Sequence, residues 1–333
     1  MSLARDRVTR LRAVAAGLVV VAVSAAACSG PSSGGRTVRR LSIATGGTGG
    51  VFYPYGGGIA KLLTEHIPGV EVTAEATAAS VDNLKFLKRG ESDVAFTMAD
   101  MAKDGLGGQD AFKDFGPVPV RALAVLYPSY THLVVRDGSI GSVAALKGKV
   151  VSTGPPGAGS AVLADRMLRL AGLDPARDIR PHNLSVSQAV DAMKDGKLDA
   201  FFWNGGVPTA AVLDLLRSPG TTAVILSLED MIPGLQRQYG SDMYYRTVIP
   251  KAAYGLAQDV PVVAVAVVLV VAETMPEELA HDITKVLFDQ QKALAAIHPQ
   301  AAQLSLQSAT KGAAIPFHPG AVRFYEENGA WTP

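Results

Sequence analysis

Cysteine is almost absent from this 333-residue chain, because Cys28 is the only one it contains. A single cysteine cannot form an intramolecular disulfide, so the folded state depends on its hydrophobic core. Long apolar runs are missing too. Residues 13–27 and 262–272 carry no charge, but both runs are shorter than the ~20 residues that a membrane-spanning helix needs.

Nucleotide-binding and catalytic motifs are also missing. The glycine-rich stretch ATGGTGGVFY at residues 44–53 is not a GxxxxGK[ST] loop, and Phe52 stands where a GxGxxG pattern needs its third glycine. No HExxH or GxSxG segment occurs, and the six histidines show no close metal-ligand spacing. We therefore expect a protein that is not an enzyme and that uses no cofactor or metal. His132 and His318 are expected to be hydrogen-bonded structural histidines.

The N-terminal residues have the form of an export signal. Four arginines within residues 5–12 precede the apolar run 13–27, which ends in Ser24-Ala25-Ala26-Ala27 just before Cys28. SAAAC resembles a bacterial lipobox, whose cysteine is lipidated and becomes the mature N-terminus. The alternative is a plain secretory signal with an incidental cysteine. Both place the protein outside the cytoplasm, and a lipidated Cys28 anchors it to the bacterial cell membrane. Residues 28–37 are small and polar and are expected to form a flexible tether.

Residues 28–333 hold 27 Lys and Arg against 29 Asp and Glu, a net charge of −2. Nucleic-acid binding rests on clustered positive charge, so no nucleic-acid partner is expected. These 306 residues exceed the ~100–200 of a typical domain, which predicts two lobes.

Two pairs of similar segments support that prediction. Strand-like residues 38–45 lead through the glycine loop into a helix at 59–66, and residues 149–160 lead in the same way into a helix at 161–168. LKRGESDVAF at 87–96 also aligns without a gap with MKDGKLDAFF at 193–202. The loops are 108 residues apart and the aligned segments 106, which predicts two lobes of similar architecture. In each aligned segment the Gly is expected to end a helix and the Asp to precede a strand.

Each lobe has a second loop that enters a helix. Ser80 is a candidate N-cap in the first lobe, and Pro208 suits the first turn of the corresponding helix in the second. Residues 45–58 and 152–160 contain no charged side chain. Helix N-termini can hold a carboxylate through free backbone N–H groups, so four such loops predict a site for a small anion or zwitterion. The alternative is that the glycines serve only tight turns and close packing.

Two segments of the chain are expected to connect the lobes. Residues 121–127 and 132–136 read as one strand leading into another, and the valine-rich run 262–272 reads as a buried strand, so we expect paired hinge strands. The chain then returns to the first lobe for helices at 276–297 and 320–328. The expected boundaries are 38–128 for the first part of lobe I, 129–261 for lobe II and 262–333 for the return.

Six segments carry a family resemblance, in order along residues 41–329: GGTGGVFYPYGGGIAKLL, ASVDNLKFLKRGESDVAF, LYPSYTHLVVR, LKGKVVSTGPPGAGS, DGKLDAFFWNGGVP and IPFHPGAVRFYEENG. The chain resembles the TAXI family, the solute receptors of TRAP-type secondary transporters. The resemblance implies an α/β fold of the type II periplasmic-binding-protein class, with a ligand cleft between two lobes. It also implies a TRAP-type permease as partner and glutamate, glutamine or a dicarboxylate such as 2-oxoglutarate as ligand. We expect the receptor to be a monomer.

The same motifs imply the ligand-binding residues, which are Gly46, Gly47, Tyr53, Ser80, Asn83, Thr153, Gly157, Gly159, Ser160, Trp203 and Asn204. Family members often have Gly-Ser where this chain has Ala79-Ser80, so its ligand can differ. Two other functions stay open. The same closing cleft serves a receptor that reports to a sensor kinase, and the fold also hosts enzymes, of which a non-covalent one is the remaining possibility.

Overall fold

The computed structural model describes residues 38–331. The predicted export signal 1–27, Cys28 and the tether lie outside the described residues. None of the helices within residues 38–331 combines the length and the apolarity that a bilayer crossing requires.

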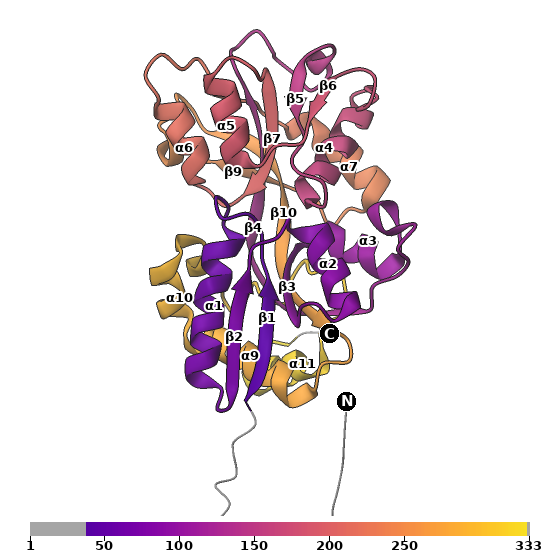
Figure 1. Ribbon diagram of the computed structural model, residues 1–333, viewed down its shortest axis with the longest axis vertical. Helices are drawn as coiled ribbons and strands as arrows, with labels where there is room; N and C mark the ends of the chain where they lie inside the picture. Colours follow the sequence, from indigo (N-terminus) through magenta and orange to yellow (C-terminus); the bar gives the residue numbers. More distant parts are fainter. Residues whose placement is uncertain (1–37, 332–333) are drawn as a thin grey trace, which may run out of the picture. The chain divides into compact units, whose positions relative to one another are not determined.

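Each of the two lobes contains three strands that alternate with three helices (Figure 1). Lobe I contains β1 (Arg39–Ala44), α1 (Phe52–His66), β2 (Val70–Glu75), α2 (Ser80–Arg89), β3 (Val94–Met98) and α3 (Ala99–Gly107). Lobe II contains β5 (Val150–Ser152), α4 (Gly159–Leu170), β6 (Arg180–His182), α5 (Val186–Lys194), β7 (Ala200–Gly205) and α6 (Ala210–Arg217). The parallel strands lie in the order β2-β1-β3 in one lobe and β6-β5-β7 in the other. The two-lobed α/β architecture is therefore confirmed.

Two long antiparallel strands, β4 (Val120–Val135) and β10 (Val260–Ala272), pass through both lobes. One half of β4 pairs with β10 beside β3, and its other half pairs with β7. The start of β10 pairs with β9 (Tyr245–Ile249). The predicted hinge strands are present, although residues 120–135 form one continuous strand, where the sequence predicted two. The rest of lobe II contains β8 (Val224–Ile225), α7 (Ile232–Tyr239) and α8 (Lys251–Tyr254).

The two aligned Gly-Asp turns fold alike. Gly90 and Gly196 take the left-handed conformation, with φ of 69° and 70°, at the ends of α2 and α5. Asp93 Oδ2 accepts the N–H of Ser42 at 2.9 Å, and Asp199 Oδ2 accepts the N–H of Val150 at 2.9 Å. In each lobe one carboxylate therefore joins the start of the third strand to the first strand.

Helix α1 begins at Phe52, whereas the sequence predicted a start at Ile59, so Gly56, Gly57 and Gly58 are helical. Gly56 has no space for a side chain, because a Cβ there would overlap Thr45 and lie 3.2 Å from Phe96 Cε2. A Cβ on Gly58 would lie 3.0 Å from Ile297 Cδ1, so Gly56 and Gly58 allow close packing of α1. The loop proper ends at Val51.

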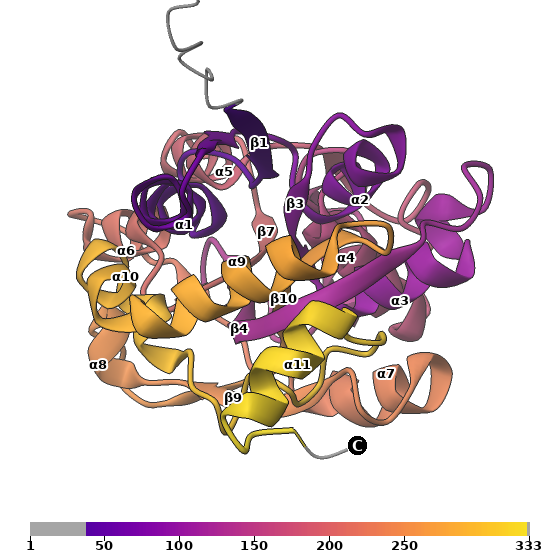
Figure 2. The same cartoon turned by 90° about the horizontal axis from the view of Figure 1, so that it is seen from below.

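The helix predicted at 276–297 is in fact two helices, α9 (Glu277–Asp289) and α10 (Gln291–Ile297), because Gln290 leaves the helical conformation with φ −106° and ψ 15°. The change of direction lets α9 pack on α11 (Pro319–Glu327) while Ile297 of α10 packs against Gly58 of α1 (Figure 2). No proline or glycine marks this break in the sequence.

A buried ion cluster joins α3 of lobe I to α4 of lobe II. Arg166 of α4 is 3 % exposed and donates hydrogen bonds to Asp104 and Asp110. Its Nη1 lies 3.5 Å from Asp100 and donates to Tyr244 Oη at 2.6 Å, and that hydroxyl donates to Asp100 at 2.9 Å. Burial raises the pKa of Asp100, and it raises the pKa of Asp104 to about 6, although Arg166 opposes both shifts.

The apolar core is also continuous between the lobes on the side where α3 meets α4. One cluster of buried side chains includes Leu84 and Met101 from lobe I together with Leu163, Met167 and Leu235 from lobe II. The lobes are thus packed together on the α3–α4 side by both apolar contacts and ion pairs.

Replacing Arg166 tests how much the ion cluster contributes. Arg166→Met keeps most of the packing volume but leaves buried carboxylates without their cation, so we expect the free energy of unfolding to fall by about 3–5 kcal/mol in urea titrations at pH 7. Arg323 is the matched control, because it also pairs with three carboxylates, Glu277, Glu278 and Glu327, but its side chain is 32 % exposed. Arg323→Met should cost at most about 1 kcal/mol. Equal losses of unfolding free energy for Arg166→Met and Arg323→Met would contradict the assignment of the buried cluster as a contact that joins the lobes.

Candidate functional site

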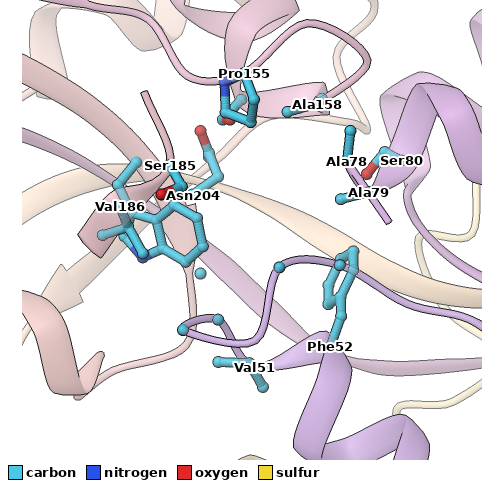
Figure 3. Close-up of a pocket in the computed structure, with 18 of the residues that line it drawn as sticks. Val51, Phe52, Ala78, Ala79, Ser80, Pro155, Ala158, Ser185, Val186 and Asn204 are labelled. Atoms are coloured by element: carbon cyan, nitrogen blue, oxygen red, sulfur yellow. The ribbon is translucent and has the colours of Figure 1, made fainter. Parts of the chain in front are cut away.

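A cavity of about 480 Å³ lies between the lobes and is lined by residues from both (Figure 3). Lobe I contributes the loop after β1 and the start of α2, and lobe II contributes the start of α4, the start of α5 and the end of β7. The predicted site residues that the cavity brings together are Gly46, Gly47, Ser80, Gly159, Ser160, Trp203 and Asn204.

Four other predicted residues do not line the cavity: Tyr53, Asn83, Thr153 and Gly157. Tyr53 is 37 % exposed. Asn83 is fully buried, and its Nδ2 donates to the carbonyls of Thr45 at 2.6 Å and Phe96 at 2.8 Å. Its Oδ1 accepts the hydroxyl of Thr77 at 2.5 Å. Asn83 therefore holds the ends of β1 and β3 behind the site.

Gly157 joins the lobes. Its carbonyl accepts the N–H of Val81 at 3.0 Å and of Asp82 at 3.2 Å, both in the first turn of α2. Its φ is 86°, and a Cβ at this position would overlap the Asp82 carboxylate, so only glycine fits here. Two first-turn donors of α2 are thus taken by lobe II.

The sequence predicted that Ser80 is the N-cap of α2, and this prediction was wrong. Ser80 is the first helical residue, and the capping position belongs to Ala79, at φ 85°. The Ser80 hydroxyl points to the end of β3 instead, where it accepts the N–H of Met98 at 3.2 Å. It lines the cavity and keeps its own proton available as a donor.

The fourth predicted loop, residues 201–208, lines the cavity through Trp203, Asn204 and Gly205. The helix after it, α6, begins only at Ala210, so Pro208 precedes the helix and is not in its first turn, and the start of α6 does not line the cavity.

The start of α5 does line the cavity, through Ser185, Val186 and Ser187. The repeat itself carried this signal, because Val186, the first residue of α5, lies 106 residues after Ser80. Ser185 and Gln188 form a reciprocal capping box, which engages the N–H groups of these two residues.

Other lining residues were not predicted: Phe52, Met98, Tyr127 and Ser129. Three of them, Phe52, Tyr127 and Ser129, lie in segments that carry the family resemblance. The Tyr127 hydroxyl is buried without a hydrogen-bond partner among the described residues, as is that of Tyr55, whose ring centroid lies 6.1 Å away. Burial raises the pKa of both tyrosines, so both remain protonated.

A chain of hydrogen bonds holds Trp203 in the cavity wall. The indole Nε1–H donates to Thr209 Oγ1 at 2.9 Å, and the N–H of Thr209 donates to Tyr254 Oη at 2.8 Å. The Tyr254 hydroxyl lies 2.9 Å from His132 Nε2, while His132 Nδ1 lies 3.0 Å from the Tyr130 carbonyl, so Nδ1 carries the proton.

His132 and His318 are hydrogen-bonded structural histidines, as predicted. His318 accepts the N–H of Gly320 through Nδ1 at 3.2 Å and caps α11.

No Asp, Glu, Lys, Arg or His side chain is found among the residues that line the cavity within 38–331. Its polar groups are hydroxyls, one carboxamide and backbone. Helices α1 and α4 both begin at the cavity without a side-chain cap. The first N–H groups of a helix have no intrahelical partner, so they can bind an anion.

A family model described as the NMT1-like family matches residues 43–329. The chain belongs to the NMT1-like family. Its match includes every element of both lobes except the first residues of β1.

Solved structures resemble this NMT1-like chain over most of its length. A binding-protein component of an ABC phosphonate transporter from Pseudomonas aeruginosa has a TM-score of 0.50 at 13 % identity, covering 78 % of this chain and 79 % of that one. The periplasmic aliphatic sulphonate binding protein SsuA from Escherichia coli has a TM-score of 0.46 at 21 % identity, covering 87 % and 83 %. The fold is that of two-lobed periplasmic binding proteins.

His132 makes stability depend on pH. Burial lowers its pKa from 6.5 to about 4, so as the pH falls the unfolded chain binds this proton first. Stability should therefore decrease from pH 6.5 to pH 4, by up to about 3 kcal/mol from this residue. We expect urea titrations at pH 7, 6, 5 and 4 to show a smaller decrease for His132→Gln than for the unmodified protein. Parallel pH profiles for the two proteins would show that His132 does not carry the effect.

Proposed function

We propose that this protein is an extracytoplasmic solute-binding protein that captures a small carboxylate between its lobes and delivers it to a membrane transporter. The observation that carries the proposal is the cavity itself, which is formed by both lobes and, among the described residues, is lined by no Asp, Glu, Lys, Arg or His side chain. A site formed by two lobes is enclosed when they close, which is a common way to sequester a small ligand.

The chemistry of the wall favours recognition over catalysis. A catalytic site needs a nucleophile with a base, an acid–base group or a metal, and the lining hydroxyls lie beside no histidine, carboxylate or amine of the cavity wall. Hydroxyls and helix N-termini instead satisfy a carboxylate by hydrogen bonds and dipoles, without a counter-charge.

The transporter class rests on the family resemblance of the six sequence segments, which implies a TRAP-type permease. The same resemblance gives glutamate, glutamine and 2-oxoglutarate as the first ligands to test. We also propose that lipidation of Cys28 anchors the protein to the outer face of the cell membrane.

Ligand binding can be measured on the soluble form that begins at Gly30. We expect at least one carboxylate in a panel of glutamate, glutamine, 2-oxoglutarate, succinate and monocarboxylates to raise the melting temperature by several degrees, because a ligand at 100 times its Kd adds about 2.7 kcal/mol. Sugars serve as the negative control.

Tryptophan fluorescence locates that binding, because the chain has only Trp203 and Trp331. Trp203 lines the cavity, whereas Trp331 packs against Phe317 and Tyr325. Trp203→Phe should remove the ligand-induced change and Trp331→Phe should keep it. Failure of every carboxylate to shift the melt would refute the proposed function.

Anchoring is tested separately. Cys28→Ala in the full chain, expressed in a bacterium that processes lipoproteins, should prevent incorporation of a fatty-acid label and release the protein from the membrane fraction. The unmodified chain is the control. Continued labelling of the Cys28→Ala protein would exclude Cys28 as the anchor.

A further inference from the structure

We infer that the cavity binds carboxylic acids whose other polar groups are uncharged, such as hydroxy and oxo acids, and that it discriminates against amino acids. This inference rests on the proposed function and narrows it to solutes without an ammonium group. It comes from the direction in which the helices around the cavity point and from the charge of the side chains near its wall.

Three helices direct their positive ends at the cavity. Helices α1, α4 and α5 begin among the lining residues, at Phe52, Gly159 and Val186. None of the three has an acidic residue in its first turn, so the positive end of each helix dipole, roughly half an elementary charge, is not offset there. Within residues 38–331, no residue from the last turn of an α-helix lines the cavity. The helix dipoles of both lobes therefore favour an anion in the cavity and oppose a cation.

Backbone donors are free at the starts of these helices. Helices α1 and α4 have no side-chain cap. In α5 the capping box engages the N–H groups of Ser185 and Gln188, and it leaves those of Val186 and Ser187 without a partner in the described part of the chain. These N–H groups can bind oxygen atoms of a solute, whereas an ammonium, which only donates, gains nothing from them.

The polar side chains of the wall are neutral. Ser80, Ser129 and Ser160 contribute hydroxyls and Asn204 a carboxamide, and the Tyr127 hydroxyl is buried without a partner among the described residues. Such groups both donate and accept, so they can hydrogen-bond a hydroxyl or a carbonyl of the solute. They can also accept from an ammonium, but they carry no charge that balances it.

Three carboxylates lie within two residues of the lining segments in the sequence, and none of them lines the cavity. Glu75 is exposed at the end of β2. Asp82 lies against Gly157, where a built Cβ would be 2.4 Å from its carboxylate carbon. Asp100 is fully buried beside Arg166. An ammonium in the closed cavity would thus be removed from water without a carboxylate partner, which costs more than the burial of a hydrogen-bonded hydroxyl.

Matched solutes that differ only in the substituent on carbon 2 isolate the effect of the ammonium. Glutarate, 2-hydroxyglutarate and glutamate carry a hydrogen, a hydroxyl and an ammonium there. Succinate, malate and aspartate repeat the comparison with four carbons, and hexanoate, 2-hydroxyhexanoate and norleucine repeat it with a single carboxylate. In the series that binds most tightly, calorimetry on the soluble form should give the amino acid a Kd at least about tenfold higher than that of the hydroxy acid.

Asn204→Asp supplies the missing carboxylate at nearly constant volume. The Thr131 hydroxyl, which accepts from Asn204 at 2.7 Å, can donate to the new carboxylate instead. The substitution should shift the ratio of the two Kd values toward the amino acid by at least about tenfold. Ser185→Asp is the second variant, in case the first is poorly folded, because aspartate is as good an N-cap as serine. Asn328→Asp, at an exposed residue after α11, is the matched control and should leave the ratio unchanged.

The possible outcomes separate the inference from the proposed function. If the amino acid binds as tightly as the hydroxy acid or more tightly, the inference is overturned and the carboxylate receptor stands. An unchanged ratio in both Asn204→Asp and Ser185→Asp, or an equal shift in Asn328→Asp, also overturns the inference. If no carboxylate binds, both proposals fail.

Discussion

A guanidinium removed from water must stay beside carboxylates, and in this molecule those carboxylates belong to the other lobe. Arg166 leaves α4 and meets Asp100, Asp104 and Asp110 from the α3 region. Separating these faces would strand buried charges of both signs, so the α3–α4 side stays together. The lobes also approach each other where Gly49 lies beside Ser187, and they share the strands β4 and β10.

The cavity is supported from the same shared strands. His132 lies on β4, and through Tyr254 and Thr209 it determines the position of the Trp203 ring. The histidine is buried and neutral, so this support carries no charge into the site. On the other side, Asn83 holds the carbonyls of Thr45 and Phe96, and with them the loop before α1. Polar side chains that do not line the cavity, Asn83 and His132, thus hold in position the residues that do.

The sequence predicted local features whose causes are local. The Gly-Asp turns at 90–93 and 196–199 followed from helix termination, and β10 from its unbroken valine run. The sequence predictions failed where a contact with a residue far away in the chain determines the local structure. The sequence pattern of Ser80 is that of an N-cap, but its hydroxyl accepts the N–H of Met98. Helix α1 extends over three glycines, of which Gly56 lies against Thr45 and Gly58 against Ile297. The break at Gln290 has no composition signal. Asn83 and Gly157 were chosen as ligand contacts by motif, and both instead bind backbone. Nothing in the sequence predicted that Arg166 joins the lobes, since a lone arginine on a helix is usually a surface residue.

The contact between Gly157 and the first turn of α2 involves only protein atoms. In the proposed function as a solute receptor, this bears on the timing of delivery. Opening the lobes transfers two N–H groups from a carbonyl to water, a change of about 1 kcal/mol for each bond, whether or not a solute is inside. The contact therefore acts on how long a captured solute is retained, and not on which solute is chosen. Because the same two bonds can form around an empty cavity, the closed shape alone does not report a loaded receptor. A transporter that recognises this shape then meets empty receptors as competitors, in proportion to how often the unfilled lobes close.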